Sequence, residues 1–252
     1  MIKFFRKLRY DLMEKNKTGK YLKYAIGEIL LVVIGILIAL QINNWNENRK
    51  AEIIELGLFK VILKDMKLDE DKIQEHINYF TQVQSMQYHI YQETKGLATY
   101  DSTESYQLLR PLRISNLVTR KNLSEKNIII KNDSVKKQLE SYFTTEEYVK
   151  NAIIDINNFK NEHLIPALSK YGIHDTQVFY ENHQLDYFEL AEKNYINYSK
   201  LKQQYGTIEF DQLLFNLGIK TSWALQGLKL AKEEGQKLKY FLENELNLSK
   251  YN

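Results

Sequence analysis

The side chains that most often carry catalysis or bind metal ions are scarce in this sequence. The chain has no cysteine, which excludes disulfides, thiolate metal sites and cysteine nucleophiles. None of its histidines stands in the H-E-x-x-H pattern of zinc proteases or in the E-x-x-H pattern of di-iron bundles. The histidines are His76, His89, His163, His174 and His183.

Three short stretches around these histidines bear on metal binding. His163 falls near the apolar spacing of its segment, which predicts a hydrogen-bonded core histidine rather than a ligand. His174-Asp175 and Glu181/His183 lie in or beside a predicted loop, where a weak metal site is the alternative. No spacing among them fixes a tetrahedral geometry. We therefore predict no metal ion and no cofactor.

Other common active sites are also missing from the pattern. The ten glycines are scattered, and the sequence lacks G-x-S-x-G, G-x-x-x-x-G-K and G-x-G-x-x-G. Acidic residues along helices indicate solvated faces, and no pair of them can be chosen as acid and base. The eighteen tyrosines suit helix packing, and without a basic groove they do not indicate nucleic-acid binding. We predict that the protein is not an enzyme and does not bind nucleic acid.

Residues 25–42, AIGEILLVVIGILIALQI, predict a transmembrane helix. Twelve of these side chains are Ile, Leu or Val, and together they favour insertion by about 4 to 7 kcal/mol. The strongly polar members are Glu28 and Gln41, and even a central acidic residue costs only about 3 kcal/mol. The alternatives are a buried core helix, which would not need the cations before it, and a cleaved signal peptide, which would need an A-x-A pattern.

The charges around this helix set its orientation. Residues 1–24 contain eight Lys or Arg, whereas residues 43–62 contain three, so the positive-inside rule places the N-terminus in the cytoplasm and the larger C-terminal part outside it. Residues 1–24 form a basic amphipathic segment suited to an anionic leaflet. Tyr21, Tyr24 and Trp45 are the predicted anchors at the two membrane interfaces.

Small residues recur on one face of the predicted membrane helix. Gly27, Gly35 and Ala39 share that face, which favours close packing against a second membrane helix. Glu28 lies about one turn inside the membrane, where it either reaches back to the interface or hydrogen-bonds to a partner helix.

Residues 17–47, KTGKYLKYAIGEILLVVIGILIALQINNWNE, resemble an uncharacterised family, defined by a domain of unknown function, of small single-span membrane proteins from Bacteroidota bacteria. The A-I-G-E-I opening, the V-V-I-G-I-L-I-A-L run and the Q-I-N-N-W-N close carry the resemblance. It implies a single-pass protein of the bacterial inner membrane, and it brings no activity, ligand or catalytic residue. With the orientation above, the C-terminal domain would be periplasmic.

Beyond the membrane helix the pattern stays helical, and only two prolines occur in the whole chain. Residues 43–95 predict a long helix or stalk, and residues 96–252 predict the remainder of a helical bundle. The stretch 96–132 is expected to be irregular, with a short strand at residues 128–130 as the alternative.

Boundaries inside the bundle follow from capping patterns. Asp133 is the predicted N-cap of the next helix. Thr144 and Glu147 have the spacing of a capping box, which predicts that a helix restarts there. A further helix is expected from residue 178 to Tyr205, just before Gly206.

The last predicted helix has the clearest pattern. Its apolar and small residues alternate in steps of four and three over more than four heptads, which is typical of a coiled-coil seam. The seam is expected either inside the bundle or between two chains. The fold class is therefore all-α, with one N-terminal transmembrane helix followed by an exported bundle of long helices. The seam includes Leu214, Leu217, Ala224, Leu228, Ala231, Gly235, Leu238 and Leu242.

These predictions favour binding over catalysis. The leading hypothesis is a membrane-anchored, non-enzymatic helical protein that acts through the lipid bilayer, the envelope, a protein partner or self-association. The alternative is a ligand-sensing exported domain that signals through the membrane helix. Because residues 1–24 are too few for an output domain, such a sensor would need a separate cytoplasmic partner. The sequence does not identify a small-molecule ligand.

Overall fold

The computed structural model describes residues 18–125, 130–186 and 193–248 as a set of helices. The three long ones are α2 (Thr18–Thr94), α4 (Asp133–Phe159) and α9 (Ile208–Leu248). In those ranges β pairing is limited to an isolated bridge between His174 and Ile196, so the all-α prediction is confirmed. The shorter elements are η1 (Tyr106–Leu109), α3 (Thr119–Glu125), η2 (Lys160–Leu164), α5 (Ile165–Lys170), α6 (Thr176–Glu181) and α8 (Tyr198–Lys202).

Some predictions fall on residues outside this description. The basic segment is described only from Thr18 onward, and the isoleucine triplet at 128–130 only at its last residue. The side chains of Tyr21 and Tyr24 also lie outside it.

The chain divides into two compact units, Met1–Gly57 and Leu58–Asn252. In the first unit, the described part is the N-terminal portion of α2. This helix is long and apolar enough to cross a bilayer, and none of its most apolar window is buried. A signal sequence near an N-terminus can pass the same test of length and composition.

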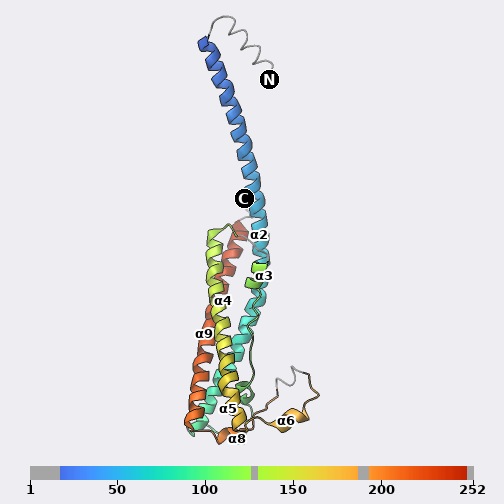
Figure 1. Cartoon of the computed structure of the whole chain (residues 1–252), viewed down its shortest axis with the longest axis vertical. Coiled ribbons are helices and arrows are strands. Elements are labelled where there is room, and N and C mark those ends of the chain that lie inside the picture. Colours follow the sequence, from blue (N-terminus) through green and yellow to red (C-terminus); the bar gives the residue numbers. More distant parts are fainter. Residues whose placement is uncertain (1–17, 126–129, 187–192, 249–252) are drawn as a thin grey trace. The chain divides into compact units, whose positions relative to one another are not determined.

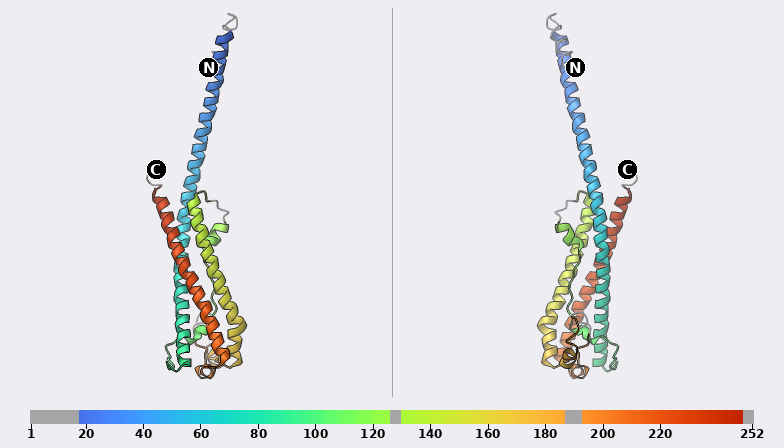
Figure 2. Two further views of the ribbon diagram at one scale, coloured as in Figure 1. Left: turned by 90° about the vertical axis from the view of Figure 1, so that its left-hand side faces the viewer. Right: turned by 90° about the vertical axis from the view of Figure 1, so that its right-hand side faces the viewer.

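The second unit is a bundle formed by the C-terminal part of α2 with α4 and α9 (Figure 1). Lys232 of α9 bonds to Gln74 and Thr221 bonds to Gln87, so α9 runs antiparallel to α2. Both views in Figure 2 show these helices side by side. The core between them includes Ile73, Phe80, Met86, Ile90, Val149, Ile153, Ile156, Leu217, Ala224, Leu228 and Ala231.

The seam of α9 faces this core. Leu214 and Gly235 are half-buried, and the other seam positions are covered by the chain's own helices. The buried members are Leu217, Ala224, Leu228, Ala231, Leu238 and Leu242.

Glycines bring α4 and α9 close together. A Cβ added at Gly227 would lie 2.6 Å from ring carbons of Tyr148, and one added at Gly235 would lie 3.3 Å from the ring of Tyr142. Sequence reasoning singled out Gly235 but missed Gly227, which follows Ala224 by one helical turn. The groove between α4 and α9 is therefore closed by direct packing.

We expect Gly227→Val to destabilise the chain by about 2 kcal/mol relative to Gly218→Val, because overpacking costs about 1 to 3 kcal/mol. Both variants place the same β-branched residue in α9, but a Cβ at Gly218 would make only an ordinary contact, 3.6 Å from Gln87. Urea unfolding followed by circular dichroism measures the difference. Equal stability of the two variants would contradict the close contact at Gly227.

The chain between α2 and α4 runs back along the groove between those two helices, and we call residues 97–118 the return segment. Side chains of α2 bond to it in reverse order along the chain, so the segment is antiparallel to α2. Tyr79 donates to the carbonyl of Pro111 at 3.3 Å, and Lys72 donates to the carbonyl of Asn116 at 2.6 Å. Asp69 accepts a hydrogen bond from the N–H of Val118 at 2.6 Å.

The other wall of that groove also binds the return segment. Lys160 is buried, and its Nζ donates to the carbonyls of Leu108 at 3.0 Å and Pro111 at 2.9 Å. Burial lowers the pKa of Lys160 to about 7. Asn157 exchanges two hydrogen bonds with the backbone of Arg113, at 2.5 and 3.1 Å. The groove between α2 and α4 is thus filled by the chain itself.

Two of the predicted boundaries in α4 are wrong. The N-cap is Asn132, whose Oδ1 accepts from two backbone N–H groups, and Asp133 is the first helical residue. Thr144 donates to the carbonyl of Glu140 one turn earlier instead of capping a new helix. Because that bond lies within the helix, α4 continues without interruption past Glu147.

The expected helix from 178 to Tyr205 is also wrong. In the described part of this stretch, α6 ends at Glu181 and α8 begins at Tyr198. Asp175 and Asn197 cap these two short helices through their side chains. Asp and Asn compete with helix interiors in this way because their side chains bond to nearby backbone N–H groups.

Candidate binding groove

The groove between α2 and α9 is open. It has a volume of about 450 Å³, within the range of small-ligand sites. The wall from α2 and the turn after it carries Gln84, Gln87, Tyr88, Tyr91 and Lys95, and the wall from α9 carries Asp211, Gln212, Leu214, Phe215, Gly218 and Ser222.

Exposed aromatic rings line much of this groove. The rings of Tyr88 and Tyr91 stack with centroids 6.4 Å apart and planes 25° from parallel. Tyr88 is 61% exposed and Phe215 is 62% exposed. The Nζ of Lys95 lies 5.6 Å from the centre of the Tyr91 ring. Exposed ring faces of this kind can stack on planar groups or hold cations.

Amide side chains bridge the two helices in this groove. Gln84 donates to the hydroxyl of Ser222 at 3.3 Å, and Gln87 donates to the hydroxyl of Thr221 at 3.1 Å. These bonds fix the amide planes, and each amide oxygen keeps its capacity to accept. Gly218 has no side chain to fill the space above Gln87. The groove is therefore open at its base because position 218 is a glycine.

A buried carboxylate anchors the turn of α2 that carries Tyr91. Glu93 accepts hydrogen bonds from the hydroxyls of Tyr106 at 3.3 Å, Tyr198 at 2.8 Å and Tyr205 at 2.6 Å. We call these four residues the Glu93 cluster. Burial, and after it the bond to Glu93, raises the pKa of Tyr205. The cluster joins the end of α2 to the chain around α8.

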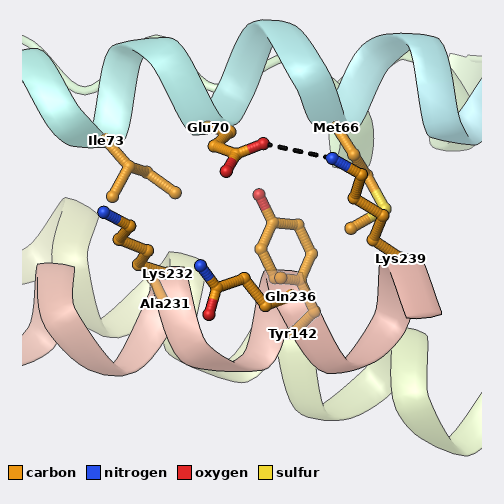
Figure 3. Close-up of a pocket in the computed structure, with 9 residues that line it drawn as sticks. Met66, Glu70, Ile73, Tyr142, Ala231, Lys232, Gln236 and Lys239 are labelled. Carbon is orange, nitrogen blue, oxygen red and sulfur yellow. Dashed lines mark ion pairs between the residues drawn. The ribbon is translucent and has the colours of Figure 1, made fainter. Parts of the chain in front are cut away.

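A second cavity lies between α2, α4 and α9 and is shown in Figure 3. Its volume is about 20 Å³, enough for a single water and too small for an organic ligand. The ring of Tyr142 points into it from α4, and Glu70 pairs with Lys239 at 3.6 Å across it. We therefore do not assign a ligand site here.

Glu146 is the most perturbed carboxyl near this cavity. It is buried, and among the residues that the structure describes its Oε2 has no hydrogen-bond partner. Burial, and after it the charge of Asp69, raises the pKa of Glu146 to about 7, against a smaller opposite effect of Arg120. Glu146 does not line the groove, so its titration bears on stability.

The structure separates the predicted site residues into two groups. Gly27, Gly35 and Ala39 are exposed in the first unit. Apart from the neighbouring backbone of the helix itself, no described atom lies within 4 Å of a Cβ built on either glycine. Glu28 is half-exposed. Trp45 is 65% exposed, and the guanidinium of Arg49 lies 5.9 Å from its ring.

The seam residues form the other group, and Leu214 alone of them lines the groove. Sequence reasoning missed the remaining groove residues. A signal was present in the closely spaced Tyr88 and Tyr91, but pairing them with Phe215 and Gly218 requires the antiparallel register of α2 and α9.

The histidines singled out above do not gather. His163 is exposed beside the ring of Phe159, at 5.6 Å, so its predicted place in the core is wrong. His174 lies 3.1 Å from the hydroxyl of Ser169. Over the described residues, no three side chains of the metal-binding types come together.

The model of a family of unknown function, DUF6090, matches residues 28–100. The match covers most of α2 and the turn that follows it, including Tyr88, Tyr91 and Glu93. It supports the resemblance seen at residues 17–47 to the extent that both point to a family of unknown function. No curated protein and no solved structure matches the chain.

Proposed function

We propose that this protein is a single-pass protein of the bacterial inner membrane whose periplasmic helical bundle is a non-enzymatic binding module. The apolar, fully exposed stretch of α2 supports the anchor, and the cationic residues before it support a cytoplasmic N-terminus. The observation that carries the binding role is the open groove between α2 and α9. Its walls combine exposed rings with amide and charged groups, as binding surfaces do.

The alternative role, a sensor for a small molecule held inside the bundle, has less support. The internal cavity holds only about 20 Å³, and the core around it is filled. Self-association through Gly27, Gly35 and Ala39 remains part of the proposal, because small residues let membrane helices approach closely.

Alkaline carbonate extraction and reporter fusions test the anchor. We expect the chain to stay in the membrane pellet, and a phosphatase fused after residue 252 to be active because it lies outside the cytoplasm. A chain released by carbonate, or a phosphatase that is inactive although the fusion accumulates, would contradict the proposal. A cytoplasmic fluorescent reporter at the N-terminus provides the matching control.

Proximity labelling from the C-terminus tests the binding role in the same cells. We expect a small set of envelope proteins to be labelled above the level of an unrelated anchored domain. A labelling pattern identical to that of the unrelated domain would count against a binding module.

A further inference from the structure

The three long helices of the second unit form three grooves, and the grooves differ in what occupies them. The α4–α9 groove is closed at Gly227, and the α2–α4 groove is filled by the return segment. The α2–α9 groove is open. The filled groove therefore shows what kind of chain the sides of this bundle accept.

The return segment is held mainly through its backbone. Tyr79, Lys72 and Lys160 donate to its carbonyl oxygens, and Asn157 bonds both the N–H and the carbonyl of one residue. The guanidinium of Arg113 lies 3.9 Å from the centre of the Tyr79 ring. A tyrosine, lysines and an amide thus bind an extended chain and one of its cationic side chains.

The open groove carries the same kinds of groups. Tyr88 and Tyr91 offer ring faces and hydroxyls, and Lys95 offers an ammonium group. Gln84, Gln87 and Gln212 are amides with both donor and acceptor atoms, as Asn157 is. Because α2 contributes to both grooves, the two sides of this helix present similar chemistry.

Charges in the groove restrict its occupant further. Lys95 lies on one wall and Asp211 on the other, so the groove carries charges of both signs. This pairing complements a segment that carries one acidic and one basic side chain. The α2 wall from Gln84 to Lys95 spans about 16 Å, which corresponds to about five residues of extended chain.

From this juxtaposition we infer that the α2–α9 groove binds an extended polypeptide segment of a partner protein, about five residues long, with oppositely charged side chains. The inference rests on the proposed binding function and names the class of its partner. The main chain bonds to the glutamines. A basic side chain meets Asp211 and an acidic one meets Lys95, because the antiparallel register of α2 and α9 places these two residues at the same end of the groove.

Selection from a displayed library of random linear decapeptides tests this inference, with the full-length chain in lipid nanodiscs as bait. We expect the enriched peptides to carry both an acidic and a basic side chain and to bind with dissociation constants of about 1 to 100 µM. Gly218→Leu should weaken them at least about tenfold, because the leucine fills the floor of the groove. The substitution is tolerated in the fold, since the nearest described atom outside the neighbouring helix backbone lies 3.6 Å from a Cβ at this position. Lys95→Glu should weaken them in a salt-dependent way.

Gln226→Leu is the matched control, since Gln226 is exposed on α9 and does not line the groove. Peptides that bind the Gly218→Leu variant as well as the wild type would overturn the inference, as would the absence of any enriched peptide. If a soluble oligosaccharide or a second copy of the chain binds the wild type and this binding is lost in Gly218→Leu, the inference would also be overturned. In those cases partners found by proximity labelling would still support the proposed function.

Discussion

Replacing Glu93 with alanine is expected to lower the free energy of unfolding by about 3 to 5 kcal/mol, among the largest effects of any single substitution in this chain. The carboxylate is the shared acceptor for Tyr106, Tyr198 and Tyr205. Removing it leaves three hydroxyls without that acceptor and opens a cavity, and both effects destabilise the folded chain. Chemical denaturation of the full chain, followed by circular dichroism, measures the loss.

A matched series separates these contributions. Glu93→Gln keeps the shape and one acceptor, so it should lose about half as much as the alanine variant, and Tyr198→Phe should lose about 1 kcal/mol. Ultraviolet titration should also show Tyr205 ionising at lower pH in Glu93→Gln, because the glutamine carries no charge. A loss below about 1 kcal/mol in Glu93→Ala would mean that the carboxylate does not anchor the end of α2.

Glu146→Gln is expected to stabilise the chain near about pH 8 and to leave its stability near about pH 4 almost unchanged. The pKa of Glu146 is raised from 4.5 to about 7 in the folded chain, first by burial and then by Asp69. The unfolded carboxyl ionises at a lower pH than the folded one, so the wild-type chain loses stability as the pH rises from 4.5 towards 7. A shift of this size corresponds to about 3 kcal/mol.

The measurement is the difference in unfolding free energy between wild type and Glu146→Gln across this range. Other groups titrate nearby, because burial lowers the pKa values of His76 and His174, but their contributions cancel in the difference. Lys160 acts in a separate window: its lowered pKa makes stability grow as the pH rises from about 7 to 10.5. A difference that does not change with pH would contradict the prediction.

Local patterns in the sequence predicted most of α2, α4 and α9, but they also predicted a helix restart at Thr144 and a long helix from 178 to Tyr205, which are wrong. The α9 seam was readable because Leu217, Leu228 and Leu238 keep helical spacing whatever the neighbouring helices are. Predictions of single boundaries failed where two local signals competed. Asn132 and Asp133 both suit an N-cap, and only the backbone geometry shows that Asn132 accepts the two bonds.

Contacts between distant parts of the chain could not be predicted. Lys160 reads as an ordinary exposed lysine in the sequence, yet it is buried because Leu108 and Pro111 present carbonyl oxygens to it. Glu93 likewise resembles any helical glutamate until Tyr198 and Tyr205, over a hundred residues later, reach it. Such pairs have no local spacing that a pattern could detect.

The groove was missed for a related reason. It exists where Gly218 leaves a gap opposite Tyr88 and Gln87, and a gap depends on the register of two helices far apart in the sequence. Gly218 is also one of three glycines in α9, and the sequence does not show that Gly227 packs against α4 while Gly218 lies open.

The helical turn η2, Lys160–Leu164, affects where the chain length can vary among relatives of this protein. Phe159 and Leu164 are both buried, although residues five apart in a regular α-helix differ by about 140° in direction. The element η2 between them is a π-helical turn, which holds one residue more than a regular α-helical turn. A homologue that lacks one residue between 160 and 164 could therefore keep a regular helix there with its core positions still aligned. The same loss near Ile153 would rotate everything after it out of register, so insertions and deletions between relatives should concentrate at this turn.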